Sequence, residues 1–388
     1  MIRRVPKIIT GAAAAVLSGF AAFYAYLYAA LPLNISAEAG AALGDVGFAP
    51  TSIRIAENGA EYFLGNIPIK HAEVTERERR FVIPGGKPFG IKMMSDGVMV
   101  IGAADGSPAE KAGLREGDVI VSVNGEEVCS NEELAEAIRK AGSCADIVYK
   151  RGESDISVSV ETMRSDGVPK IGAWVRDSAA GIGTLTFIDP ATGVFGGLGH
   201  AVSDATTGDP VPFKRGEITA ADIYDIIPGE KGSAGELCGA MLPEELGEIT
   251  CNTPAGVFGK LSDERYGGDL DDLVTDLTAN TVPMAFRQEV KPGAATILTT
   301  IEGSEPREYS IEIERINLAD LGGSKGMLIK ITDPELLEKT GGIVRGMSGS
   351  PILQNGRLAG AITHVLVGDP TRGYAVFAES MLEKAFGS

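Results

Sequence analysis

Gly346-Met347-Ser348-Gly349-Ser350-Pro351, near the C-terminal end of the sequence, surrounds a serine with small residues. Glycines permit backbone conformations that other residues avoid, and they leave room for a substrate beside Ser348. The N–H groups of such a turn can point at the place where an oxyanion develops during attack on a carbonyl. The Asn355-Gly356 pair, between apolar runs at 351–354 and 357–367, predicts a hairpin. The pattern fits a serine nucleophile on a tight turn, but a small-residue turn without chemistry has the same composition.

A serine nucleophile needs a nearby base, and the sequence contains three histidines. His200 lies in the glycine-rich segment 196–204 (GGLGHAVSD), where an imidazole is accessible and can approach another loop. His71 lies in a charged region and is expected at the surface. His364 lies in a predicted strand and is the weaker candidate. We therefore predict His200 as the base, on a lobe that meets Ser348 at a cleft, because such a pairing depends on geometry rather than on sequence order.

Longer segments resemble a known family of peptidases. Residues 346–351 resemble the nucleophile turn of chymotrypsin-like serine proteases, in which the histidine also precedes the serine. Residues 172–187 (GAWVRDSAAGIGTLTF), 196–204 and 341–365 (GGIVRGMSGSPILQNGRLAGAITHV) resemble the SpoIVB peptidase family. This resemblance implies a mainly β fold with a chymotrypsin-like double β-barrel. It also implies a serine endopeptidase that acts between the two membranes of a developing endospore.

The same resemblance implies a partner and a place in a signalling sequence. The protein substrate would be a regulatory subunit of an intramembrane metalloprotease complex, and its cleavage would lead to activation of a late sigma factor. A peptidase of this kind requires no cofactor and no metal. The sequence agrees, because it has no Cys-x-x-Cys pair and no His/Cys cluster.

Carried over residue by residue, the resemblance implies Ser348 as the nucleophile and His200 as the general base. The amides of Gly346 and Ser348 would form the oxyanion hole. For the third member of the triad it points to Asp333, which lies closer to the nucleophile than the acid of chymotrypsin-like enzymes does. The Asp333-Pro334 step is also a common start of a helix or turn. The other candidate acids are Asp204, Asp263, Asp269, Asp271, Asp272, Asp276 and Asp320.

Residues 81–165 show the ordered pattern of a PDZ domain. Residues 131–140 predict the amphipathic helix that flanks a peptide groove. Phe89, Gly90 and Ile91 resemble the loop and strand whose amides bind the terminal carboxylate of a peptide. PDZ domains also dock segments of their own chain, and the pattern leaves both roles open.

The first 37 residues predict a membrane anchor. Three basic residues precede an uncharged run over 8–37. This run exceeds the apolar region of a signal peptide, about 7–15 residues, and reaches the roughly 20 residues needed to span a membrane. The positive flank places the rest of the chain outside the cytoplasm, and later cleavage near 29–39 remains open. Residues 38–80 are expected to be a linker or small β unit, a place for partners or self-cleavage, and 166–388 the serine peptidase domain.

The formal net charge of −18 is spread along the 388 residues. Nucleic acids and anionic lipids attract basic surfaces, so neither is an expected partner.

Cys129 and Cys144 bracket a predicted helix about 15 Å long, too far apart for a disulfide. Cys238 and Cys251 enclose a short loop and are expected either to bond or to remain free thiols.

Two other functions remain open from the sequence. A non-catalytic adaptor would use its PDZ domain to gather membrane-protein tails over an inactive barrel. A quality-control protease of the HtrA kind usually places its protease before its PDZ domain, and here the order is reversed. The presence of both His200 and Ser348 in open, glycine-rich segments favours a serine endopeptidase.

Overall fold

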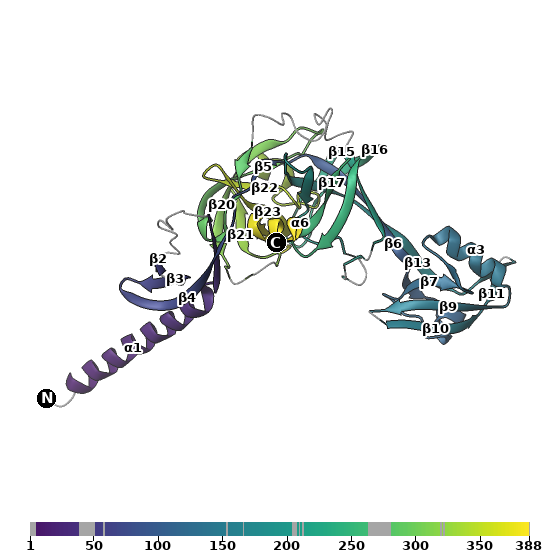
Figure 1. The fold of residues 1–388 in the computed structure, drawn as a ribbon, viewed down its shortest axis with the longest axis horizontal. Coiled ribbons are helices and arrows are strands. Elements are labelled where there is room, and N and C mark those ends of the chain that lie inside the picture. Colours follow the sequence, from purple (N-terminus) through teal and green to yellow (C-terminus); the bar gives the residue numbers. More distant parts are fainter. Residues whose placement is uncertain are drawn as a thin grey trace.

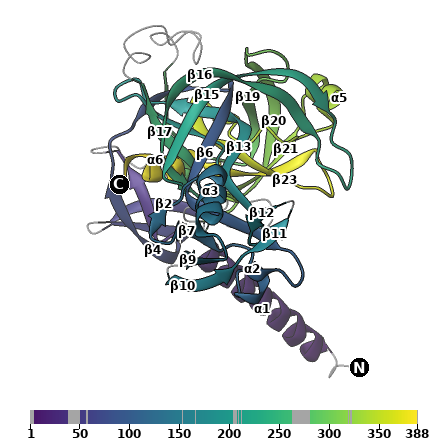
Figure 2. The same cartoon turned by 90° about the vertical axis from the view of Figure 1, so that its right-hand side faces the viewer.

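The protein is mainly β, as predicted, with two β-barrels at its centre (Figure 1). Helix α1 (Val5–Ala30) lies at one end, and the domain predicted to be a PDZ domain lies at the other end of two long strands. Figure 2 views the molecule from the PDZ side, with the barrels behind that domain. The computed structural model describes residues 5–38, 51–56, 59–152, 154–165, 167–203, 208, 210, 211, 213–262, 281–318, 320 and 323–387.

The first barrel, here barrel 1, is a closed ring of strands. Strand β6 pairs with β13 on one side and with β15 on the other. From β15 the ring continues through β16, β17 and β14 and returns to β13. Closure leaves no unpaired sheet edge. The strands are β6 (Pro88–Ala103), β13 (Ala173–Ile188), β14 (Val194–Gly197), β15 (Arg215–Ile227), β16 (Glu236–Thr253) and β17 (Gly256–Leu261).

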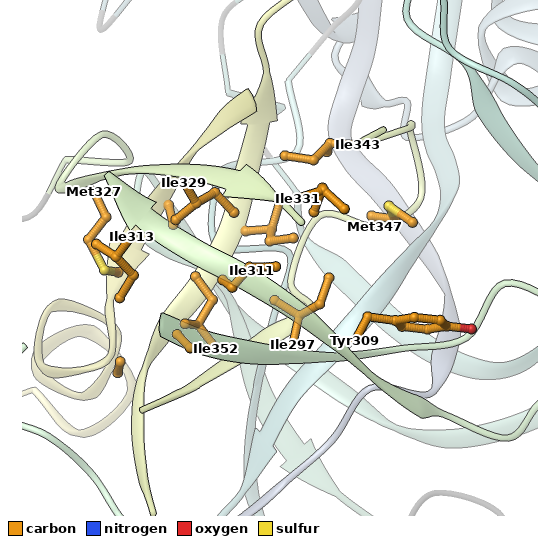
Figure 3. Close-up of a cluster of buried hydrophobic side chains, with 14 of the residues drawn as sticks. Ile297, Tyr309, Ile311, Ile313, Met327, Ile329, Ile331, Ile343, Met347 and Ile352 are labelled. Atoms are coloured by element: carbon orange, nitrogen blue, oxygen red, sulfur yellow. The ribbon is translucent and has the colours of Figure 1, made fainter. Parts of the chain in front are cut away.

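The second barrel, barrel 2, follows in the chain and carries the serine turn. Alternate residues of its strands point inward, so Ile311 and Ile313 of one strand are buried while Ser310 and Glu312 are exposed. Figure 3 shows these isoleucines meeting Ile297, Ile329 and Ile352 in a packed core. Its strands are β19 (Gly293–Thr299), β20 (Arg307–Ile316), β21 (Met327–Ile331), β22 (Pro351–Gln354), β23 (Arg357–Val365) and β24 (Arg372–Phe377).

The PDZ domain is inserted into barrel 1 rather than placed before it. The second half of β6 pairs with β7, and its last residues pair with the first residues of β13, Ala173–Arg176. Helix α3 begins at the N-cap Ser130, whose side chain accepts a hydrogen bond from the Glu133 amide. The remaining elements are α2 (Pro108–Lys111), β7 (Val119–Val123), β8 (Glu126–Glu127), α3 (Asn131–Ala141), β9 (Cys144–Arg151), β10 (Ser154–Glu161), β11 (Met163–Ser165) and β12 (Val168–Lys170).

This insertion corrects the domain boundary expected at residue 166. The first half of β6 belongs to barrel 1, so the peptidase domain is built from segments on both sides of the PDZ domain. It also corrects the expected peptide-binding residues. Phe89 and Ile91 are buried in the core of barrel 1, and Gly90 is paired with Ile182 and Thr219 on its two sides. A terminal carboxylate therefore has no access to these amides.

A small sheet joins α1 to the barrels. Its order is β1-β4-β3-β2, and Leu27 of α1 and Leu31, just after the helix, pack on it beside Tyr62. None of the helices within the described residues has the length and apolar character needed to cross a membrane, so the predicted anchor is not confirmed. The strands are β1 (Asn34–Ala37), β2 (Thr51–Ala56), β3 (Gly59–Leu64) and β4 (Ile67–Glu76).

The C-terminal helix α6 (Ala378–Phe386) ties this sheet to the barrels through a buried carboxylate. Glu379 receives hydrogen bonds from Arg287 Nε and from the Arg287 amide, each 2.8 Å long. The Ser36 hydroxyl of β1 also donates to Glu379.

The four cysteines are free thiols in the structure. The short elements not yet named are β5 (Phe81–Pro84), β18 (Val282–Pro283), the 3-10 turn η2 (Arg287–Glu289) and α5 (Pro334–Thr340).

The close packing around Gly90 yields a stability prediction. A Cβ at this position would lie 2.4 Å from Thr219 Oγ1 and 2.5 Å from Met241 Cγ. We therefore expect Gly90→Ala to lower the free energy of unfolding by about 1–3 kcal/mol, as overpacking does. Gly181 pairs with Ile91 on the same ribbon, and a Cβ there meets nothing within 4 Å. Gly181→Ala should leave stability unchanged or raise it. Equal thermal midpoints for the two variants would contradict the packing.

Candidate active site

The serine turn holds one accessible and one buried hydroxyl. Ser348 is half-buried, between Gly346 and Gly349, whose φ angles of 97° and 96° favour glycine. Ser350 is fully buried, and its Oγ donates to Met347 O at 2.7 Å and lies 3.0 Å from Thr299 Oγ1. Ser350 therefore stabilises the turn, and Ser348 is the hydroxyl available for chemistry.

Two threonines of barrel 1 clamp this turn of barrel 2. Thr184 N–H donates to Ser348 O at 2.9 Å, and Thr184 Oγ1 donates to Gly346 O at 2.8 Å. Thr186 Oγ1 donates to Gly349 O at 2.7 Å. The two threonines are two residues apart on β13 and so share a face of the strand. Their role was not predicted from the sequence, although hydroxyls inside an apolar strand indicate that buried hydrogen-bond partners are needed.

The segment that carries His200 lies against the serine turn. A Cβ at Gly349 would lie 2.5 Å from Leu198 N, and one at Gly199 would lie 3.0 Å from Thr363 Cγ2. Thr363 in turn accepts the Ser348 hydroxyl through its carbonyl, at 2.8 Å. The structure therefore brings the two predicted residues into one site at the junction of the barrels.

The hydrogen bond at His200 Nδ1 decides which nitrogen can act as the base. Nδ1 lies 2.7 Å from Ala201 O, and a carbonyl oxygen only accepts, so Nδ1 carries the proton. In the neutral ring, Nε2 then has a free lone pair. Burial lowers the pKa of His200 below its ordinary value, while the bond to Ala201 acts in the opposite direction. The imidazole is thus neutral near pH 7 and able to accept the Ser348 proton.

His364 lies beside the predicted base, and it follows Thr363, whose carbonyl accepts the Ser348 hydroxyl. Its ring centroid is 4.9 Å from that of His200, with an interplanar angle of 37°. Burial, then His200 and then Lys325 lower the pKa of His364. Two adjacent imidazoles disfavour each other's protonation, so both remain neutral near pH 7.

The amides predicted for the oxyanion hole remain unused by the fold. Among the hydrogen bonds of the described residues, neither Gly346 N–H nor Ser348 N–H has an acceptor. The neighbouring amide of Gly349 is bonded to Ile362 O at 2.8 Å. Two donors next to the nucleophile are therefore free to stabilise negative charge on a bound carbonyl.

Asp333 caps a helix in the structure. Its Oδ1 accepts the amides of Glu335 at 3.0 Å and Leu336 at 3.1 Å, and its Oδ2 accepts the Ser310 amide at 3.3 Å. Across the described residues, no hydrogen bond links a carboxylate to His200. The triad role of Asp333 therefore stays a prediction. Asp320 accepts the amide of Lys325 at 2.8 Å. The other candidate acids, Asp204, Asp263, Asp269, Asp271, Asp272 and Asp276, lie outside the described residues.

A second candidate site lies on the PDZ domain. A groove of about 410 Å³ separates helix α3 from residues 168–175. Leu134, Ala135 and Ile138 line it on the helix side, with the cationic residues Arg139 and Lys170 near them. The groove is thus mostly apolar with positive charge nearby, and Phe89–Ile91 are not among its lining residues.

Two β-barrels with a serine turn and a histidine loop at their junction suit a serine peptidase, a class recognised by the geometry of its groups, here with a PDZ domain inserted. The family model named SpoIVB peptidase S55 matches residues 167–382, more than half of the chain, and a PDZ model matches 99–151. The chain belongs to the SpoIVB peptidase S55 family. This membership and the serine protease relatives support a serine endopeptidase.

Curated relatives resemble a limited part of the chain. Serine protease HTRA1 of Xenopus tropicalis is 39% identical over 17% of this chain and 14% of its own length. A probable periplasmic serine endoprotease DegP-like of Rhizobium meliloti is 34% identical over 19% and 15%. The PDZ domain of the SdrC-like protein from Listeria monocytogenes is 28% identical over 21% of this chain and 87% of its own. The TM-score of this structural match is 0.19.

The two serines of the turn lead to opposite expectations. Ser348→Ala should abolish peptide hydrolysis and labelling by an organophosphorus serine reagent, because it removes the accessible hydroxyl. Ser350→Ala should lose about 1 kcal/mol of stability, since its buried hydrogen bonds disappear, yet still hydrolyse peptide and be labelled at Ser348. Mass spectrometry of the labelled peptide checks the assignment, and labelling of the Ser348→Ala protein at Ser350 would contradict it.

The variant Asp333→Asn tests whether Asp333 serves only as a helix cap or also as the triad acid. Asparagine caps helices about as well as aspartate, so the thermal midpoint is expected to change little. If Asp333 also orients His200, turnover should fall by about 10⁴, the loss seen for this change in the best-studied triad. Turnover close to that of the parent would assign the carboxylate to the cap alone.

Proposed function

We propose that the protein hydrolyses peptide bonds with Ser348 as the nucleophile and His200 as the general base. The observation that carries this proposal is the orientation of His200, whose Nδ1 is bonded to Ala201 O while Nε2 remains free. The segment before His200 lies against the turn that holds Ser348. An inactive barrel would not need a neutral imidazole of this tautomer beside an accessible hydroxyl.

The reaction begins with a change of partner at the nucleophile. The Ser348 hydroxyl, which donates to Thr363 O in the free protein, turns to donate to His200 Nε2. As Oγ attacks the peptide carbonyl, the proton passes to Nε2 and the oxyanion is stabilised by the amides of Gly346 and Ser348. His200 then returns the proton to the leaving amine, and water releases the acyl group by the same steps.

We further propose that this endopeptidase signals during endospore formation. Its substrate would be a regulatory subunit of an intramembrane metalloprotease complex, cleaved in the space between the mother-cell and forespore membranes. Membership of the SpoIVB peptidase S55 family supports this proposal. A relative named as periplasmic supports a location outside the cytoplasm. Attachment to a membrane through residues 1–37 remains part of the proposal.

The PDZ groove suits the tail of a protein substrate. Its apolar lining would hold a C-terminal apolar side chain, and the positive charges of Arg139 and Lys170 favour a terminal carboxylate. Binding a tail there raises the local concentration of substrate at the barrels. A purely adaptor role would use the groove as well, but it would make no use of the free oxyanion amides at Gly346 and Ser348.

Filling the groove should slow protein cleavage and spare short peptides. Ala135 is exposed on α3 and lines the groove, so Ala135→Glu places bulk and negative charge where the carboxylate would bind. We expect at least a tenfold loss of kcat/KM on the extracytoplasmic part of the regulatory subunit, with hydrolysis of a short soluble peptide unchanged. Ala180→Glu, at an exposed position of β13 outside the groove, is the matched control.

Three results would count against the proposal. Equal loss on both substrates for Ala135→Glu would show that the PDZ domain builds the active site rather than binding a tail. No loss on either would make the domain a spacer. Failure of the parent to cleave the regulatory subunit, while it cleaves a short peptide, would exclude that substrate but not the endopeptidase.

A further inference from the structure

One side chain outside the predicted site is bonded to the segment that carries His200. Asn252 lies near the end of β16, and its Oδ1 accepts the Val202 amide at 2.8 Å. Its Nδ2 donates to Val202 O at 2.9 Å and to Val211 O at 3.3 Å. A single amide thus holds Val202 on both sides, two residues after the histidine.

The bond to Val202 N–H has a direct consequence for the imidazole. The N–H of Val202 and the C=O of Ala201 belong to one planar peptide unit and point in opposite directions. Asn252 accepts from the N–H end, while His200 Nδ1–H donates to the C=O end at 2.7 Å. Rotation of this peptide would break both hydrogen bonds together. Each bond also polarises the unit in the sense that strengthens the other.

We propose that Asn252 is a positioning residue for the general base, acting through the Ala201–Val202 peptide unit. This proposal rests on the proposed function of His200. The peptide carbonyl fills the place at Nδ1 that a triad acid fills in other enzymes, holding the ring in the tautomer that leaves Nε2 free. Unlike a carboxylate, it carries no net charge. It therefore orients the imidazole without the full stabilisation that a negative charge would give to the imidazolium formed during attack.

Gln354 offers a matched control on the other barrel. Its Oε1 accepts the Lys291 amide at 3.0 Å, and its Nε2 donates to Lys291 O at 2.8 Å and Ala294 O at 3.3 Å. The pattern is that of Asn252: an amide that holds both groups of one residue and a second carbonyl. The hydrogen bonds of Gln354 go to Lys291 and Ala294 and to neither His200 nor Ser348, so its loss should affect stability without affecting His200.

The test compares Asn252→Ala with Gln354→Ala in the full chain. Asn252→Ala should lower kcat and the rate of Ser348 labelling by an uncharged organophosphorus reagent about 10- to 100-fold, because misplaced catalytic groups lose rate on that scale. KM for a short peptide should stay unchanged. Gln354→Ala should lose similar stability but keep the parent rates, when both are measured well below their thermal midpoints. Parent rates in Asn252→Ala, or equal rate losses in the two variants, would overturn the proposal.

A spectroscopic measurement keeps the proposal testable even if Asn252→Ala does not fold. Nitrogen-15 NMR of the His200 ring distinguishes the two neutral tautomers independently of activity. The parent should show the Nδ1–H form near pH 7, and a folded Asn252→Ala should show a mixture. An Nε2–H ring in the parent would overturn the proposal. If a folded Asn252→Ala shows the mixture and the parent shows the Nδ1–H form but is not labelled at Ser348, the proposed function fails while the positioning by Asn252 stands.

Discussion

The pairing of β13 with its neighbours positions the PDZ groove, barrel 1 and the serine turn relative to one another. Its first residues pair with β6 at the PDZ groove, and its middle residues close barrel 1 against the other half of β6. Thr184, near the C-terminal end of β13, donates two hydrogen bonds to the serine turn of barrel 2. One continuous strand therefore forms part of the groove wall, the barrel and the support of the nucleophile. A shift of its register by one residue would turn Thr184 and Thr186 away from that turn.

The candidate active site is assembled from neutral groups and backbone dipoles. Thr363 O accepts the Ser348 hydroxyl, Ala201 O accepts from His200 Nδ1, and the amides of Gly346 and Ser348 have no acceptor among the described residues. Burial lowers the pKa of His200, which keeps the imidazole unprotonated near neutral pH. Since the unfolded chain takes up this proton at a higher pH than the folded protein, the histidine costs stability as the pH falls below about 6.5. Such a site is organised for proton transfer at neutral pH rather than in acid.

The insertion of the PDZ domain joins its groove to barrel 1 through continuous strands, without a flexible linker. In a chain with separate domains, a tail in the groove would only raise the local concentration of substrate. Here the strands that lead from the groove are themselves strands of barrel 1, so the groove keeps a defined direction to the site. The long β6–β13 ribbon in Figure 1 makes this connection visible.

The sequence alone indicated a glycine-flanked serine turn, a histidine candidate, the mainly β class and a PDZ domain. These features depend on local chemistry: glycines beside Ser348, glycines around His200, and an amphipathic helix with its cap. Only the tertiary structure decided where β6 belongs, because Phe89 and Ile91 suit a peptide-binding strand and a barrel core equally well until their partners are known. The same is true of Thr184, Thr186 and Asn252, which act on residues far along the chain. Spacing reveals a turn or a helix, but the partner of a buried polar group is set by which strands the closed barrels bring together.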